Sequence, residues 1–131
     1  MKIAVDTNVL VRAAVRDDVE QTDAATKLMA RAKMVAIAVP SLCEFVWVLR
    51  SVYHFQSSDI AKAIRTLLAA ENVEANRPAT DAGLAVLDAG GDFADGVIAY
   101  EGKWLAAETF VSFDKKAVEM LTALGVSARA L

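Results

Sequence analysis

The sequence predicts an α/β domain of three layers, in which helices cover both faces of a mainly parallel central sheet. Short apolar runs with β-branched residues alternate along the chain with longer segments whose apolar residues recur every three or four positions. At 131 residues the chain has room for one complete core, and no repeat, linker or block of charge divides it. We therefore expect a single domain over residues 1–131, with right-handed crossovers between its strands.

Four short apolar runs are the predicted strands. They are Lys2–Val5, Val35–Val39, Thr109–Phe113 and, less apolar than the others, Val126–Leu131 after Gly125. The continuous apolar character of the first two is typical of strands buried on both faces of a parallel sheet.

Helical spacing predicts the segments between these strands. The expected helices are Thr22–Ala32, Ser41–His54, Asp59–Ala70, Thr80–Ala89, Asp95–Leu105 and Lys115–Leu124. The second is apolar on almost every face, which predicts a central buried helix with Ser41 as its N-cap. The third and fourth follow one another without a predicted strand, so we expect an inserted helical hairpin, with Gly90-Gly91 ending its second helix.

Composition excludes several classes of protein. The longest uncharged run, Met34–Cys43, has ten residues, whereas a membrane-spanning helix needs about 20, so we expect no membrane segment. The single cysteine cannot form an internal disulfide, and no signal peptide is visible, which favours the cytoplasm. The net charge of −3 does not attract nucleic acid by itself. A nucleic-acid partner would need a local basic rim, for which the candidates are Arg12, Arg50, Lys103, Lys115 and Lys116.

Acidic residues follow the predicted strands. Asp6 and Asp114 end the first and third strands, at the edge where parallel sheets bind ligands. Glu44 lies one turn beyond the second strand in an apolar segment, where a buried carboxylate would need a compensating cation. Asp92 and Asp95 are three residues apart, so both can face the same side of a helix start.

Each of these acids has an ordinary structural explanation as a helix cap, a turn residue or an ion-pair partner. Converging carboxylates without a cation, however, would repel one another and take up protons. A hard divalent ion resolves that conflict, and oxygen ligands without a cluster of His or Cys favour Mg²⁺ or Mn²⁺ over Zn²⁺. Such a site suits the hydrolysis of a phosphodiester bond.

Four segments in this order carry a family resemblance. They are Val5-Asp6-Thr7-Asn8-Val9-Leu10, the lone acid Glu44, Asp92-Phe93-Ala94-Asp95-Gly96-Val97-Ile98-Ala99, and Ser112-Phe113-Asp114. Together they resemble a PIN-domain ribonuclease, and their length and order are similar to those of the VapC toxins of bacterial toxin-antitoxin pairs. The resemblance covers essentially the whole chain. It implies a PIN-like fold and a Mg²⁺- or Mn²⁺-dependent endoribonuclease acting on RNA.

The resemblance also implies roles for individual residues. Asp6, Glu44, Asp95 and Asp114 would be the catalytic, metal-binding acids, and Asp92 an additional or alternative metal ligand. Thr7, Asn8 and Ser112 would orient the carboxylates or water. Two departures from the family pattern occur: Gly96 replaces a larger apolar residue, which is expected to loosen the turn at Asp95, and Lys115-Lys116 replaces an Asp-Phe pair.

The same resemblance implies three partners: an RNA substrate, a cognate antitoxin from the same operon, and a second copy in a homodimer. The apolar surplus of the sequence, 56% hydrophobic residues, agrees with an interface, although an Ala-rich helical core would also explain it.

Other functions fit less well. A haloacid-dehalogenase-type phosphatase needs a second Asp two residues after the first, where Asn8 stands. A receiver-like signalling module needs an Asp ending a central strand, but the second strand ends in Val39-Pro40. A PIN fold that only binds RNA or a partner remains the non-catalytic alternative.

Overall fold

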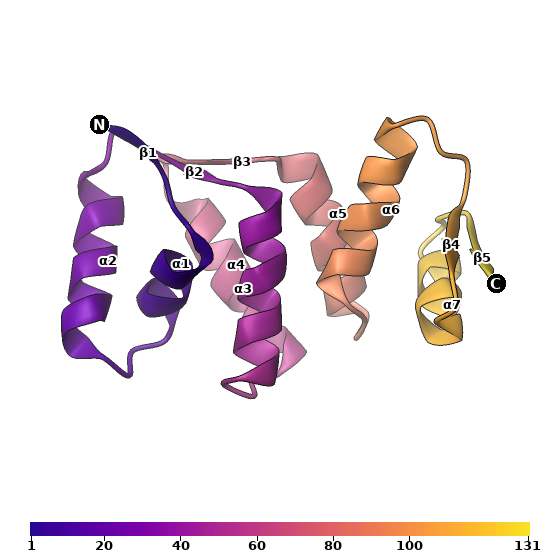
Figure 1. Cartoon of the computed structure of the whole chain (residues 1–131), viewed down its shortest axis with the longest axis horizontal. Coiled ribbons are helices and arrows are strands. Elements are labelled where there is room, and N and C mark those ends of the chain that lie inside the picture. Colours follow the sequence, from indigo (N-terminus) through magenta and orange to yellow (C-terminus); the bar gives the residue numbers. More distant parts are fainter. The chain divides into compact units, whose positions relative to one another are not determined.

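The computed structural model describes residues 1–131, which divide into two compact units, residues 1–76 (the first unit) and residues 77–131 (the second unit) (Figure 1). All three strand pairs are parallel, so the predicted α/β class and the parallel sheet are confirmed. None of the helices is both long and apolar enough to span a membrane.

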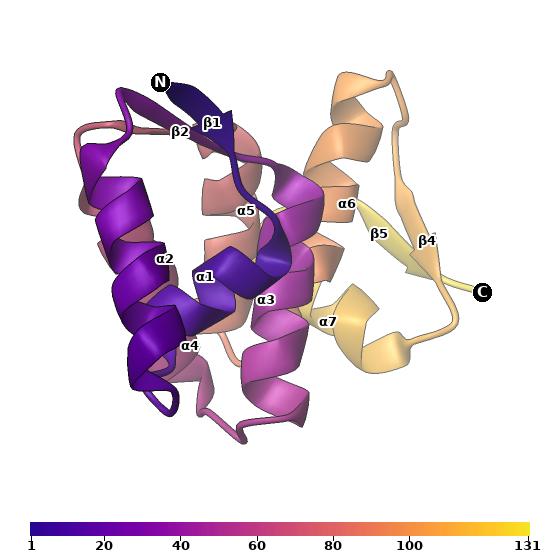
Figure 2. The same ribbon diagram turned by 60° about the vertical axis from the view of Figure 1, so that its left-hand side comes forward.

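The first unit is built on a three-stranded parallel sheet in the order β1-β2-β3. Its strands are β1 (Lys2–Ala4), β2 (Met34–Ile37) and β3 (Val73–Ala75), and its helices are α1 (Thr7–Ala14), α2 (Val19–Arg31), α3 (Val39–Ser51) and α4 (Ser57–Ala69). Only the central strand β2 shows the predicted burial, with Val35 and Ile37 inside, because the two edge strands have a neighbour on one side only. Helix α1 packs against α2 and α3 (Figure 2).

Helix α3 is less buried than the sequence suggests. Leu42, Phe45 and Leu49 are fully buried in the core of the first unit, but Trp47 is 64% exposed. The prediction of a central buried helix therefore holds for one face of α3 and is wrong for the face that carries Trp47. The predicted cap at Ser41 is also wrong: the helix begins at Val39, because the fixed φ of Pro40 suits a first helical turn.

Two elements were not predicted. Helix α1 follows β1 directly, and its Leu10 and Val11 are buried. Strand β3 stands between the two helices expected to form a hairpin, so α4 leads back into the sheet instead of turning into the next helix. A run of three residues, with the charged Glu74 in its middle, is too short to give a periodic signal.

The second unit consists of a helical hairpin and a small two-stranded parallel sheet. It contains α5 (Arg77–Asp88), α6 (Phe93–Trp104), β4 (Phe110–Ser112), α7 (Lys115–Ala123) and β5 (Ala128–Ala130), with β4 paired to β5. Helices α5 and α6 lie side by side (Figure 1). All four strands predicted from the sequence are thus present, each somewhat shorter than expected or shifted by one residue.

Glycines bring α5 and α6 close together. A Cβ placed on Gly96 would lie 2.3 Å from the carbonyl oxygen of Ala82, and one on Gly83 would lie 2.6 Å from the ring of Phe93. The expectation that Gly96 loosens the turn at Asp95 is therefore wrong. The absence of a side chain lets α6 seat its first turns directly on the α5 backbone.

Helices α6 and α7 end in the same way but with different residues. After α6, Ala106 N–H donates to Lys103 O and Ala107 N–H donates to Gly102 O; after α7, Gly125 and Val126 make the equivalent bonds. Both turns require positive φ, which is 76° at Ala106 and 85° at Gly125. Glycine adopts this conformation without strain, whereas alanine does so at a cost of roughly 1 kcal/mol.

We expect Ala106→Gly to raise the free energy of unfolding by about 1 kcal/mol, because it relieves the strained φ at the end of α6. Gly125→Ala is the reciprocal control: a Cβ there meets nothing within 4 Å, so the backbone alone should lower stability by a similar amount. Urea unfolding of both variants measures this, and a destabilised Ala106→Gly protein would contradict it.

Candidate functional site

Three of the predicted site acids are N-caps of helices. Asp6 accepts a hydrogen bond from Val9 N–H (3.2 Å) at the start of α1. Asp92 and Asp114 do the same at the starts of α6 and α7, by accepting from Ala94 N–H (3.2 Å) and Ala117 N–H (3.1 Å). Each carboxylate is thus held at a helix start through Oδ1, and its Oδ2 accepts no hydrogen bond from the protein.

In the first unit the fold brings Asp6, Thr7 and Glu44 together. Thr7 follows Asp6 and donates through Oγ1 to Oε2 of Glu44 on α3, over 3.2 Å. Glu44 is exposed, so the expectation of a buried carboxylate that needs a cation is wrong. Asn8 is exposed in the first turn of α1 and hydrogen-bonds to neither acid.

In the second unit the fold brings Asp92, Asp95 and Asp114 near one another. Burial raises the pKa of the Asp95 carboxyl above its usual 3.8, and the negative charges of Asp92 and then Asp114 raise it further. Asp95 caps no helix; it lies half-buried in the first turn of α6. Ser112 accepts the backbone N–H of Asp114 (3.0 Å), which fixes the turn carrying that acid.

No lysine or arginine forms an ion pair with any of these five acids. Their donor atoms are all carboxylate oxygens, which are the ligands that Mg²⁺ and Mn²⁺ prefer, and the mutual repulsion at Asp95 is the electrostatic situation that a divalent cation relieves. The residues therefore fit such an ion by their chemistry. No three acidic, His or Cys side chains are gathered into a ready-made metal site.

Two of the five residues of the predicted basic rim have partners within the protein. Arg12 is paired with Asp17 (3.1 Å), and Arg50 donates to Ser57 Oγ (2.9 Å). The three lysines, all in the second unit, are exposed: Lys103, Lys115 and Lys116. Lys115 and Lys116 open α7, where positive charge opposes the helix dipole, so a nearby anion would stabilise this helix start.

Sequence reasoning missed Phe113 as a candidate. The predicted strand Thr109–Phe113 includes it, but β4 ends at Ser112, and the Phe113 side chain is 79% exposed directly before Asp114. An exposed aromatic ring beside an acidic site can stack on a nucleobase. Its position between Ser112 and Asp114, at the end of a strand, is the only sequence signal that could have indicated this.

We expect Asp95→Asn to raise the melting temperature at pH 7.5 in EDTA. Because the pKa of Asp95 is raised in the folded protein, stability is lost as the pH rises from 3.8 through that raised pKa, and the amide removes this effect. Below pH 4 the gain should disappear, since the wild-type carboxyl is then protonated. Thermal unfolding at both pH values measures it, with Asp81→Asn on α5 as the control. An equal gain at both pH values would refute the electrostatic origin.

Comparison with known proteins adds one positive finding. The profile described as PIN domain matches residues 3–120, a range that includes all five acids. No protein of curated function matches the sequence.

Proposed function

Since the chain belongs to the PIN domain family, whose members are generally metal-dependent nucleases, we propose that it is a metal-dependent endoribonuclease. The finer proposal is a VapC-type toxin of a toxin-antitoxin pair. The observation that carries the nuclease proposal is the group Asp92, Asp95 and Asp114, which has no cationic partner: burial, and then the charges of Asp92 and Asp114, raise the pKa of Asp95. The family match over residues 3–120 supports treating both units as one functional domain.

We assign the binding of Mg²⁺ or Mn²⁺ to Asp6, Glu44, Asp95 and Asp114, with Asp92 as a further acid. The ion, when bound, would supply a water of lowered pKa and neutralise charge on the phosphate. The chain's own contribution is to position the ligands. The caps hold Asp6 and Asp114 by one oxygen each, and Thr7 holds Glu44, so the remaining carboxylate oxygens are available to a ligand.

Substrate binding falls to the second unit in this proposal. Lys115 and Lys116 would contact RNA phosphates, because they are exposed beside Asp114 and oppose the dipole of α7. Phe113 would stack on a base next to the scissile phosphate. The two lysines supply local positive charge in a protein whose net charge is −3.

A protein partner would bind the first unit. A hollow of about 430 Å³ lies between the end of α1 and α4, with a floor of small and apolar residues that includes Ala13, Ala63 and Leu67. Its charged residues are Arg16, Lys62 and Asp59, so two positive charges exceed one negative charge and an amphipathic helix with acidic flanks fits it. We propose this hollow as the contact for a cognate antitoxin. The exposed Trp47 supports a homodimer contact, and the proposed location is the cytoplasm.

The nuclease proposal is tested by incubating the purified chain with total RNA in Mg²⁺, in Mn²⁺ and in EDTA, and by mapping the cleaved sites. We expect discrete cleavage that EDTA abolishes. Binding of RNA without cleavage in any metal would instead favour the non-catalytic alternative. Co-expression with the small reading frame immediately upstream tests the toxin proposal, since a copurifying inhibitor is expected.

Metal binding should also be visible without activity. We expect Mg²⁺ or Mn²⁺ to raise the melting temperature, because an ion that binds only the folded state stabilises it by about RT ln(1 + [L]/Kd). Asp6→Asn should reduce this gain. Equal shifts in wild type and variant, or equal shifts with Ca²⁺, would indicate nonspecific ion effects.

A further inference from the structure

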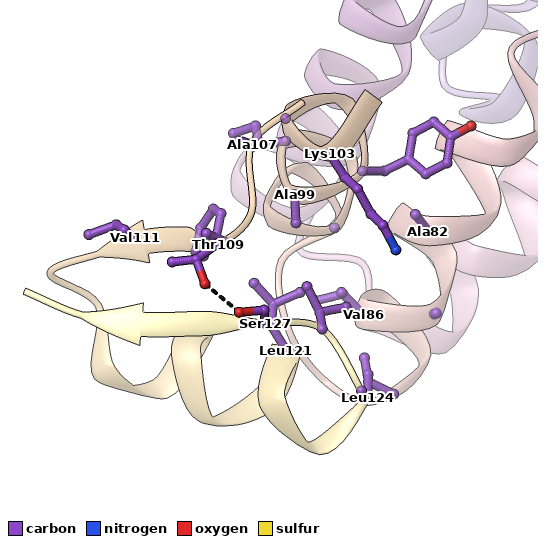
Figure 3. Close-up of a pocket in the computed structure, with 18 of the residues that line it drawn as sticks. Ala82, Val86, Ala99, Lys103, Ala107, Thr109, Val111, Leu121, Leu124 and Ser127 are labelled. Carbon is purple, nitrogen blue, oxygen red and sulfur yellow. Dashed lines mark hydrogen bonds between the residues drawn. The ribbon is translucent and has the colours of Figure 1, made fainter. Parts of the chain in front are cut away.

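The second unit contains a cavity of about 820 Å³ that the nuclease proposal does not use. Helix α6 forms one wall, with the end of α5 beside it, and β4, β5 and α7 form the opposite wall (Figure 3). Its size lies within the range of small-molecule sites, which are roughly 300–1,000 Å³ and mostly apolar. Ala99 on α6, Val86 on α5 and Leu121 on α7 point toward this space (Figure 3).

Few polar side chains line the cavity: Lys103 and Glu108 are charged, and Tyr100, Thr109 and Ser127 carry hydroxyls. Thr109 directly precedes β4, and Ser127 directly precedes β5. Their hydroxyls hydrogen-bond to each other, so each has a partner within the protein. Lys103 is the only cation in the lining, and its side chain extends from α6 toward Ala82 on the neighbouring α5 (Figure 3). Lys103 forms no ion pair, and neither does Glu108, the one acid of the lining, in the loop before β4.

We propose that this cavity binds a small amphiphilic anion, an apolar chain or ring that ends in a single carboxylate. The apolar part would pack against Ala99, Val86 and Leu121, and the carboxylate would form a charge-assisted hydrogen bond with the Lys103 ammonium group. An apolar ligand without charge would gain nothing from the ammonium group, which is exposed to water, and a cationic one would be repelled. The proposal is independent of the nuclease function.

The test uses the full chain and three probes of one length: decanoate, decanol and decyltrimethylammonium, each below its micelle concentration. Isothermal titration should show decanoate binding at one site, about tenfold more tightly than decanol, with the cation weakest. Binding of the cation as tight as that of decanoate, or no binding by any probe, would overturn the proposal.

Variants locate the site. Lys103→Gln should weaken decanoate binding about tenfold and leave decanol unchanged, whereas Lys27→Gln on α2 should change neither. Glu108→Gln should strengthen decanoate binding, because it removes the one negative charge of the lining. Ala99→Leu narrows the cavity at its α6 wall and should weaken binding of both probes, with circular dichroism confirming the fold. Undiminished binding by folded Ala99→Leu would place the ligand elsewhere and refute the assignment.

Discussion

Asp6→Asn is expected to reduce RNA cleavage by about three orders of magnitude while leaving the fold intact. Asparagine is as good an N-cap as aspartate, so the bond from Val9 N–H is retained and only the negative charge is lost. The same reasoning applies to Asp114→Asn at the start of α7. Loss of activity in these variants would therefore report the loss of a metal-binding charge instead of the loss of a cap.

The measurement is kcat/KM on a mapped cleavage site, with the melting temperature in EDTA as the check on folding. Asp23→Asn, an exposed acid on α2, is the control and should retain full activity. Asp95→Ala should be as inactive as Asp6→Asn, whereas Asp92→Ala should lose less. If Asp92→Ala were inactive and Asp95→Ala active, the roles of these two acids would be reversed.

Thr7→Val tests whether the hydrogen bond to Glu44 matters for catalysis. A residue that orients a metal ligand typically contributes 10- to 100-fold, so we expect an intermediate loss of activity. Thr7→Ser keeps the hydroxyl and should restore most of it. Equal activity of Thr7→Val and wild type would limit the 3.2 Å bond to a structural role.

Gly96→Ala is the substitution with the largest expected effect on stability. The new Cβ would stand 2.3 Å from Ala82 O and 2.9 Å from Gly83 Cα, both backbone atoms that cannot move without separating α5 from α6. Alanine favours a helix by up to about 1 kcal/mol over glycine, but the overlap should outweigh this and lower the free energy of unfolding by about 3 kcal/mol.

Gly102→Ala provides a matched control in the same helix. A Cβ at Gly102 would meet only the Cβ of Ala107, at 3.8 Å, which is an ordinary contact. We therefore expect Gly102→Ala to raise stability slightly, by about 0.5–1 kcal/mol, through helix propensity alone. Urea unfolding of the two variants should give opposite signs. A tolerated Gly96→Ala would show that the two helices can separate without cost.

Periodicity in the sequence predicts long elements of secondary structure but not short strands or the exposure of single side chains. The long helices and the strands at Lys2–Val5 and Val35–Val39 were predicted because their apolar spacing is sustained. Strand β3 was missed because three residues carry no period. The environment of Glu44 was also missed, since its exposure depends on which face of α3 packs on the core, and almost every face of that helix is apolar.

In the candidate site, too, some features could be predicted from the sequence and others could not. The sequence places carboxylates at the ends of strands, and in the structure burial and the nearby charges of Asp92 and Asp114 raise the pKa of Asp95. The sequence offers a helix cap as one explanation of these acids but does not decide which of them cap, because a capping bond depends on where the helix starts, and helix starts are among the least certain features of a sequence. In the structure Asp6, Asp92 and Asp114 are the caps. The sequence also does not predict that Arg12 pairs with Asp17 or that Arg50 donates to Ser57, because these contacts depend on local geometry.

The parallel pairing of the first unit has a consequence for how the chain folds. Lys2 pairs with Met34 and Val35 pairs with Val73, so the sheet closes only after two helical crossovers have been made. The α5–α6 hairpin, by contrast, forms between neighbouring segments and involves a much shorter loop. Folding from local contacts is faster, so α5 and α6 should acquire amide protection first in pulsed hydrogen exchange. On the ribosome, one edge of β2 stays unpaired until β3 is synthesised, and during that interval the side chains of Val35 and Ile37 are open to chaperones.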